Sequence, residues 1–148
     1  MPSFRKAREI DPRILIEEGL EVREIECGII GNSRILTSEI GEVNYESDWY
    51  DYDSKYHSNN KIIIPAEIDS KIKREIKEIA TKSCRALNIF GFARVDFFLD
   101  KSSNKILLNE INTIPGFTKN SMFPMLWEAS GLNIEQLVAK LVDITLDL

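Results

Sequence analysis

GFARVDFFLD, residues 91–100, and LNEINTIPG, residues 108–116, are the two stretches that decide the fold. Apolar and polar residues alternate in both, and aromatic and β-branched side chains are frequent, which predicts two β-strands. The sequence Ser-Ser-Asn at residues 102–104 lies between them and favours a turn. The two stretches should therefore form an antiparallel hairpin.

One face of this hairpin collects polar side chains, because alternate residues of a strand point to the same side. The expected register contains three cross-strand pairs: Leu99 with Leu107, Asp96 with Glu110, and Arg94 with Asn112. Directly opposite Cβ atoms lie about 5 Å apart. On the second strand, the residues expected to share this face are Ile106, Leu108, Glu110 and Asn112.

The alternative is a register shifted by one residue. It would place Asn109 opposite Asp96 and turn Glu110 to the other face. Because that shift would put two polar groups among apolar side chains, the first register is favoured.

The four polar side chains of the hairpin allow two interpretations. Opposed carboxylates repel unless a positive group lies between them, and Arg94 can be that group in a surface cluster of modest energetic value. The other interpretation is a magnesium site, since Mg²⁺ prefers carboxylate oxygens completed by phosphate and water. Asp96, Glu110 and the amide oxygen of Asn112 would be the ligands. Arg94 would then neutralise charge on a transferring phosphoryl group.

The segment after the hairpin favours a functional site. Pro115 and Gly116 leave the strand in a rigid turn, where a glycine N–H can approach a developing oxyanion. Ser121 opens a short helix that ends at Gly131, and the first N–H groups of a helix form a seat for a carboxylate. Metal, oxyanion donor and anion seat would thus be neighbours in the sequence.

The remaining patterns predict an α+β fold, an antiparallel sheet flanked by helices. Further strands are expected at residues 13–17, 23–30 and 34–43. A helix is expected over residues 70–87, where apolar residues recur every three or four positions, and Asp69 or Ser70 can cap it. Asn133 opens a last helix, whose expected buried face comprises Ile134, Leu137, Val138, Leu141 and Val142.

Residues 46–60 have no aliphatic side chain and no helical period. So long a loop in a compact domain is usually functional or disordered. Its four aromatic residues argue against simple disorder: Trp49, Tyr50, Tyr52 and Tyr56. The segment is either a surface flap or a lid over a ligand, and the tendency of loops to carry function favours the lid.

The composition predicts one cytoplasmic domain. The chain has 148 residues, of which 43% are hydrophobic, enough for one core. A net charge of -5 without a cluster of basic residues argues against nucleic acid, and no apolar run approaches a membrane span. Cys27 and Cys84 are too few for a disulfide framework and are expected to be buried thiols. The lone histidine, His57, is interpreted as a loop residue.

Together, these motifs resemble the C-terminal part of the D-alanine–D-alanine ligases, members of the ATP-grasp superfamily. The resemblance is carried by Arg94-Val-Asp96, Leu108-Asn-Glu110-Ile-Asn112, Pro115-Gly116 and Ser121-Met-Phe-Pro124. Upstream, residues 14–18 with Arg23-Glu24 resemble the ATP-binding strand segment, and residues 51–56 resemble the flexible lid loop. The resemblance implies that the sheet is an ATP-grasp C-terminal lobe.

The family joins two D-alanines using ATP for peptidoglycan synthesis. The first carboxylate is phosphorylated, the amine of the second D-alanine attacks the acyl phosphate, and phosphate leaves. The implied nucleotide contacts are Glu17, Glu18 and Leu20 at the adenine, Glu24 at the ribose and Lys55 at the phosphates. The implied ligands of two Mg²⁺ ions, with Mn²⁺ as an alternative, are Asp96, Glu110 as the bridge, and Asn112.

The remaining implied roles concern the substrates. Arg94 and the Gly116 N–H would stabilise the transition state, and Tyr56 would close the lid together with Lys55. Ser121 and Met122 would seat the carboxylate of the second D-alanine. Relatives that use D-lactate or D-serine often carry arginine at the Met122 position, so methionine favours D-alanine.

The resemblance also implies that part of the enzyme is missing. In the family, an N-terminal domain binds the first D-alanine and a central domain supplies phosphate-binding lysines. Residues 1–20 are expected to be a remnant of that central subdomain and residues 21–148 the C-terminal ligase domain. The chain would be a truncated, split or fragmentary ligase, inactive alone, with D-alanine and the missing lobes as partners and a homodimer as one option. The alternatives are a catalytically silent binding module and another ATP-grasp carboxylate–amine ligase.

Overall fold

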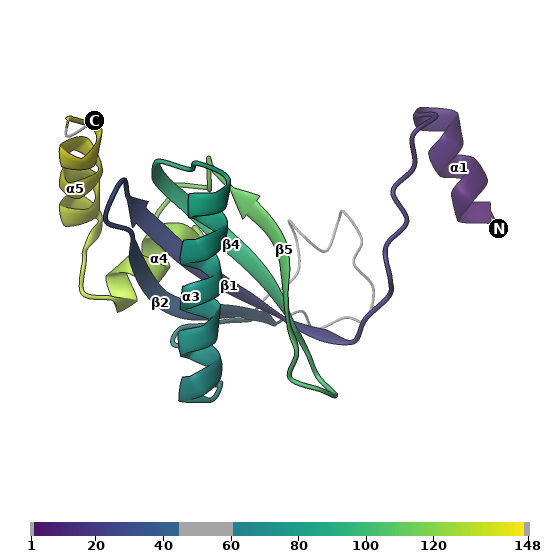
Figure 1. The fold of residues 1–148 in the computed structure, drawn as a ribbon, viewed down its shortest axis with the longest axis horizontal. Coiled ribbons are helices and arrows are strands. Elements are labelled where there is room, and N and C mark those ends of the chain that lie inside the picture. Colours follow the sequence, from purple (N-terminus) through teal and green to yellow (C-terminus); the bar gives the residue numbers. More distant parts are fainter. Residues whose placement is uncertain (1, 45–60, 147–148) are drawn as a thin grey trace.

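A five-stranded sheet forms the body of the molecule in the computed structural model, which describes residues 2–44 and 61–146. In spatial order its strands are β3 (Lys61–Ile63), β2 (Leu36–Asn44), β1 (Val22–Gly31), β4 (Gly91–Asp100) and β5 (Ile106–Asn112). The helices are α1 (Pro2–Ile10), α3 (Ser70–Ala86), α4 (Met122–Ala129) and α5 (Ile134–Leu146). All neighbouring strands pair antiparallel, so the predicted α+β fold is confirmed (Figure 1).

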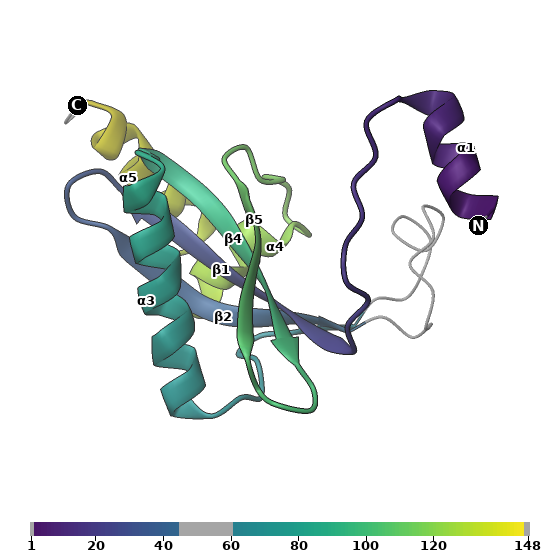
Figure 2. The same cartoon turned by 45° about the vertical axis from the view of Figure 1, so that its right-hand side comes forward.

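Helix α3 covers one face of the sheet (Figures 1 and 2). Asp69 caps its start by accepting a hydrogen bond from the Lys71 N–H at 2.7 Å. The helix buries Ile76, Ala80 and Cys84 against the sheet residues Ile25, Cys27, Ile29, Ala93, Val95, Phe97 and Leu99. Burial raises the pKa of the Cys27 thiol to about 12 and that of the Cys84 thiol to about 11. Both cysteines are therefore the buried thiols that the sequence predicts.

Helices α4 and α5 cover one end of the opposite face. Phe123 and Trp127 of α4 and Leu137 of α5 pack against Ile30 of β1. Phe92 joins this cluster, with its ring centre 5.7 Å from that of Phe123. The middle of this face, over β1, β4 and β5, carries the polar residues of the hairpin.

The hairpin register is confirmed at the polar residues and wrong beyond them. As predicted, Arg94 pairs with Asn112 and Asp96 pairs with Glu110. The next pairs are Phe97 with Leu108, Phe98 with Leu107 and Leu99 with Ile106, so the predicted pairing of Leu99 with Leu107 is wrong.

A β-bulge explains the difference. Asn109 is an extra residue of β5 that has no partner on β4, so the strand changes register at this point. The bulge turns Ile106 and Leu108 to the face covered by α3, where Ile106 packs against the core. The prediction that these two residues share a face with Glu110 is therefore wrong.

The predicted strand at residues 13–17 is also wrong. Residues 11–21 form no strand, and the residues before them form helix α1, which lies away from the sheet (Figure 1). Leu15 and Ile16 are 81% and 77% exposed. An apolar run becomes a strand only where another strand accepts its hydrogen bonds, and this segment has no such neighbour among the described residues.

The last helix is where predicted, but its buried face is narrower. Leu137 is buried and Leu141 packs beside it, whereas Ile134, Val138 and Val142 are 45%, 46% and 52% exposed. The reason is that α5 lies at the end of the sheet and contacts it along one side only (Figure 1). None of the helices within residues 2–44 and 61–146 is long and apolar enough to span a membrane.

Candidate active site

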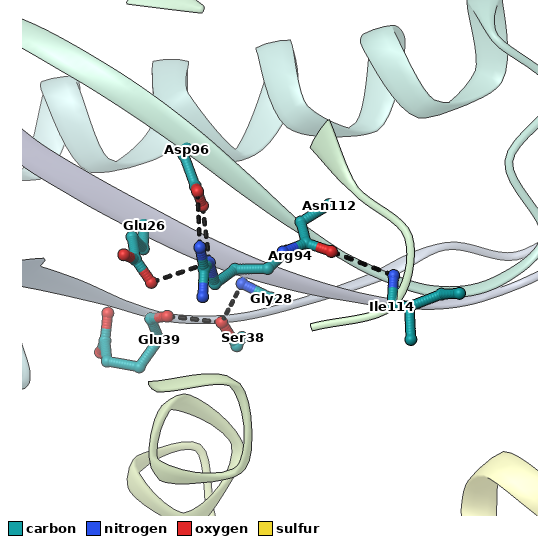
Figure 3. Close-up of polar contacts among 8 residues, drawn as sticks. All are labelled: Glu26, Gly28, Ser38, Glu39, Arg94, Asp96, Asn112 and Ile114. Atoms are coloured by element: carbon teal, nitrogen blue, oxygen red, sulfur yellow. Dashed lines mark hydrogen bonds and ion pairs between the residues drawn. The ribbon is translucent and has the colours of Figure 1, made fainter. Parts of the chain in front are cut away.

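Arg94 lies at the centre of the polar face of the sheet (Figure 3). Its Nε and Nη2 atoms donate hydrogen bonds to the two carboxylate oxygens of Asp96, each at 2.7 Å. Glu26 of β1 approaches from a second direction, with its Oε2 atom 2.9 Å from Nε. The pairing of β1 with β4 places Glu26 opposite Asp96 and Gly28 opposite Arg94. Two carboxylates of residues only 8% and 9% exposed therefore hold the guanidinium.

Gly28 allows helix α4 to approach the sheet beside this cluster. A Cβ atom at this position would lie 2.8 Å from Nε1 of Trp127 and 3.1 Å from Oγ of Ser38. The Ser38 hydroxyl accepts a hydrogen bond from the Gly28 N–H at 2.8 Å and donates to the Glu39 carbonyl at 2.5 Å (Figure 3). The absence of a side chain at Gly28 thus lets Trp127 of α4 pack directly against β1 beside the residue pair Gly28–Arg94.

Among the residues that the structure describes, the carboxylates of this face outnumber the positive charges. Burial and, next, the negative charge of Asp96 raise the pKa of Glu26, although Arg94 acts in the opposite direction. The hydrogen bond to Asp96 raises the pKa of Arg94, so the guanidinium remains charged. One guanidinium faces the carboxylates of Glu26, Asp96 and Glu110. A divalent cation would offset the excess negative charge.

The donors of the predicted metal site lie side by side on β4 and β5. Within the described residues, no three His, Cys, Asp or Glu side chains gather closely enough to hold a metal ion. The predicted set therefore depends on the amide oxygen of Asn112 and on phosphate oxygens of a ligand, as is usual for Mg²⁺. Asn112 Oδ1 accepts a hydrogen bond from the Ile114 N–H at 3.1 Å, and a hollow of about 400 Å³ opens along residues 110–114. By donor type, Asp96, Glu110 and Asn112 fit magnesium.

The turn from β5 to α4 brings Gly116 against Ser121. A Cβ atom on Gly116 would lie 2.9 Å from the Ser121 Oγ atom. That hydroxyl accepts a hydrogen bond from the Thr118 N–H at 3.0 Å and contacts the Thr118 hydroxyl at 2.8 Å. Ser121 occupies the N-cap position of α4 as predicted, but its side chain makes no capping hydrogen bond. The first N–H groups of the helix therefore remain available to an anion.

The side chain of Met122 points away from this seat. Only 6% of the residue is exposed, and its sulfur would lie 3.0 Å from a Cβ atom on Gly41 of the sheet. Met122 can therefore meet a ligand through its backbone N–H but not through its thioether.

Comparison with known families decides how this arrangement is classified. A family model described as "D-ala D-ala ligase C-terminus" matches residues 2–143. The chain belongs to this D-Ala–D-Ala ligase C-terminal family. The resemblance stated from the motifs alone is confirmed.

Individual members of the D-Ala–D-Ala ligase family are similar along the whole chain. A D-alanine–D-alanine ligase of Prochlorococcus marinus strain MIT 9301 is 90% identical over 99% of this chain and 41% of its own length. The D-alanine–D-alanine ligase of strain NATL2A is 50% identical over 93% of this chain and 40% of its own length. The chain therefore spans about two fifths of the length of these relatives.

Solved ligase structures have the same fold. The D-alanine–D-alanine ligase from Coxiella burnetii has a TM-score of 0.82 at 34% identity, over 99% of this chain and 38% of that one. The VanG D-Ala:D-Ser ligase from Enterococcus faecalis has a TM-score of 0.76 at 36% identity, over 86% of this chain and 37% of that one.

The structure groups some of the family's expected site residues and separates others. Arg94, Asp96, Glu110 and Asn112 lie together, and Glu24 lies on the same face of β1 as Glu26. Three expected adenine contacts lie instead in the exposed segment between α1 and β1: Glu17, Glu18 and Leu20. Lys55, Tyr56 and the predicted lid fall outside the described residues, and the proposed domain boundary after residue 20 stays a prediction.

Glu26 is the site residue that the sequence analysis missed. The only local signal is the alternation of Glu24 and Glu26 within an otherwise apolar strand. That alternation shows a polar stripe but does not show which strand pairs with it. The contact with Arg94 depends on β1 lying beside β4, although the two strands are far apart in the sequence, with β1 ending at Gly31 and β4 beginning at Gly91.

Proposed function

We propose that this chain is the C-terminal part of an ATP- and magnesium-dependent ligase that joins two D-alanines for peptidoglycan synthesis. The arrangement of Arg94, Asp96, Glu110 and Asn112 on one face, next to the turn at Gly116, is the observation that carries the proposal. The names of the relatives that are 90% and 50% identical support the choice of substrate.

The proposed metal ligands are Asp96, Glu110 and Asn112. In this role Glu110 would be shared by two Mg²⁺ ions, and Mn²⁺ is the expected substitute. When bound, these ions would neutralise the charge of the ATP phosphates and orient them.

The chain's own groups would stabilise the negative charge that develops during transfer. The carboxylate of the first D-alanine takes the terminal phosphoryl group of ATP, the amine of the second attacks the acyl phosphate, and phosphate leaves. Arg94 faces the phosphoryl oxygens, and the Gly116 N–H faces the oxyanion. The Ser121 hydroxyl and the Met122 N–H seat the carboxylate of the second D-alanine.

The other partners follow from the same proposal. Glu17, Glu18, Leu20 and Glu24 would contact the nucleoside, and Lys55 and Tyr56 would close over the phosphates and the substrates. The first D-alanine would be bound by the other lobes of the ligase, in the cytoplasm, and the assembled enzyme could be a homodimer.

The direct test is a chimeric ligase. The complete chain replaces the matching residues of the Prochlorococcus marinus MIT 9301 ligase, which it covers at 90% identity. The chimera should release phosphate from ATP in the presence of D-alanine, and D-alanyl-D-alanine should accumulate in equal amount. Glu110→Gln should abolish this turnover while the circular dichroism spectrum stays unchanged, because the bridging carboxylate is lost.

The rival functions give different results in the same assay. A folded chimera that forms no dipeptide with any D-amino acid would support the catalytically silent module. A preference for D-serine or D-lactate over D-alanine as second substrate would support another ligase specificity. Normal turnover by the Glu110→Gln variant would contradict the assignment of Glu110 as a metal ligand.

A further inference from the structure

In the proposed enzyme, the Asp96 carboxylate has two partners, the Arg94 guanidinium and the divalent cation. These two interactions can compete for the same oxygens. Both Asp96 carboxylate oxygens accept hydrogen bonds from Arg94, at 2.7 Å each. A metal ligand must give at least one oxygen to the cation. Each carboxylate oxygen has two lone pairs, so the cation competes with Arg94 only when it binds on the side of the carboxylate that faces the guanidinium. If the function proposed above is correct and the cation binds on that side, one of the two hydrogen bonds opens and Arg94 loses one of its two anchors.

Glu26 is in position to replace that anchor. Its Oε2 atom lies 2.9 Å from the same Nε atom that donates to Asp96. This oxygen is buried and accepts no well-directed hydrogen bond from any residue that the structure describes. A buried carboxylate oxygen that has an ion-pair partner but no directed hydrogen bond needs an explanation, because its desolvation is only partly compensated.

Other carboxylates near the sheet are less suited. Glu42 is equally buried, at 7% exposure, but it lies on the α3 face and accepts two hydrogen bonds from Arg23, at 2.7 and 2.6 Å. Glu110 is exposed and is itself an expected metal ligand. Only Glu26 combines burial, a free acceptor and contact with Arg94 within the described residues.

We propose that Glu26 is a positioning residue that holds the Arg94 guanidinium in place when Asp96 turns an oxygen to the divalent cation. The Nε–H then points to Glu26, Nη2 keeps its hydrogen bond to the second Asp96 oxygen, and the remaining N–H groups of the guanidinium serve the phosphoryl oxygens. Glu26 binds neither metal nor substrate. It acts through Arg94, and it lowers the free energy that is needed to break a hydrogen bond between Arg94 and Asp96 when the cation binds.

The test measures Mn²⁺ affinity of the chimeric ligase in the presence of ADP, by electron paramagnetic resonance of the free ion. Glu26→Ala should raise the Kd for Mn²⁺ about tenfold or more, because Arg94 then keeps both oxygens of Asp96. In an Arg94→Met background, the same substitution should change the Kd less than about twofold. Glu42→Ala is the matched control, a buried acid paired with an arginine on the other face, and it should leave the Kd unchanged.

Glu26→Gln separates positioning from simple charge. Its side-chain oxygen can still accept from Nε, so the Kd should stay within about threefold of the unmodified value. A loss as large as that of Glu26→Ala, or an equal effect of Glu26→Ala in the Arg94→Met background, would show that Glu26 acts by its charge and would overturn the proposal. An unchanged Kd for Glu26→Ala would overturn it as well.

Failure of the proposed function would look different. A chimera that binds Mn²⁺ and follows the expected pattern of variants, but forms no dipeptide, would remove the ligase assignment and leave the role of Glu26 intact. A chimera that binds no Mn²⁺ would contradict both the proposed ligase function and the positioning role of Glu26.

Discussion

Arg94 and Arg13 show at the scale of single residues how burial changes the value of the same contact. Each arginine binds an aspartate two positions away, with Nε–oxygen distances of 2.7 and 3.2 Å. The Arg13 side chain is 91% exposed, and an ion pair so open to solvent adds little to stability. The Arg94 side chain is 19% exposed, and breaking a buried pair costs about 3–5 kcal/mol because the remaining charge stays uncompensated. Removing one partner of the pair in the site is therefore costly, whereas the pair at Arg13 is dispensable.

Asp100, also at the scale of single residues, leads to a prediction about how stability depends on pH. Hydrogen bonds from the hydroxyls of Ser102 and Ser103, followed by the Ser103 N–H, lower the pKa of Asp100 to about 2. Since this folded value lies below the ordinary 3.8, the ionised side chain stabilises the fold above about pH 4, and this contribution is lost as the pH falls through 2. Asp100→Ala should therefore lower the urea midpoint at pH 6, and the difference should shrink between pH 4 and 2. A difference that is constant over this range would contradict the assignment.

At the scale of elements, the hairpin shows why the alternation of polar and apolar residues predicts only part of the strand pairing. Alternation predicted both strands and the pairs Arg94–Asn112 and Asp96–Glu110, because a polar and an apolar face must separate. Alternation could not predict the bulge at Asn109. An unpaired residue on an edge strand costs little, and no periodic signal marks it.

The bulge at Asn109 leads to a prediction about the stability of the protein. Deleting Asn109 should join the two halves of the β4–β5 ladder into a regular one, with both sets of observed pairs kept, and should change the free energy of unfolding by less than about 1 kcal/mol. Deleting Leu108 is the control, because Asn109 would then take the place opposite Phe97, and a polar amide would replace an apolar side chain on the α3 face. Urea denaturation should show the second deletion to be clearly the more damaging. Equal losses would mean that Asn109 has a structural role of its own.

The whole molecule is divided between a packed body and an extended N-terminal segment (Figures 1 and 2). The apolar side chains of Ile10, Leu15 and Ile16 are 89%, 81% and 77% exposed, so they add little to the stability of the sheet. The first backbone contact of the segment with the β4–β5 turn is at Glu21, whose carbonyl accepts from the Lys101 N–H at 3.0 Å.

Removal of residues 2–19 should therefore change the free energy of unfolding by less than about 0.5 kcal/mol in urea. Removal of residues 134–148 serves as the contrast, because it takes away the fully buried Leu137, and loss of such a side chain alone costs about 2–5 kcal/mol. A large loss from the first truncation would show that the N-terminal segment packs against the body in solution.

The sequence by itself determined the α+β class, the core helix at residues 70–86, the polar face of the hairpin and the family. These features depend on the periodicity of apolar residues and on motifs within one short stretch, so neighbours along the chain are enough to define them. Tertiary structure alone decided that Glu26 contacts Arg94, that residues 13–17 are not a strand and that α5 exposes three of the five residues of its predicted buried face. Each of these depends on which element lies alongside another, and that choice is made by packing between segments far apart in the sequence.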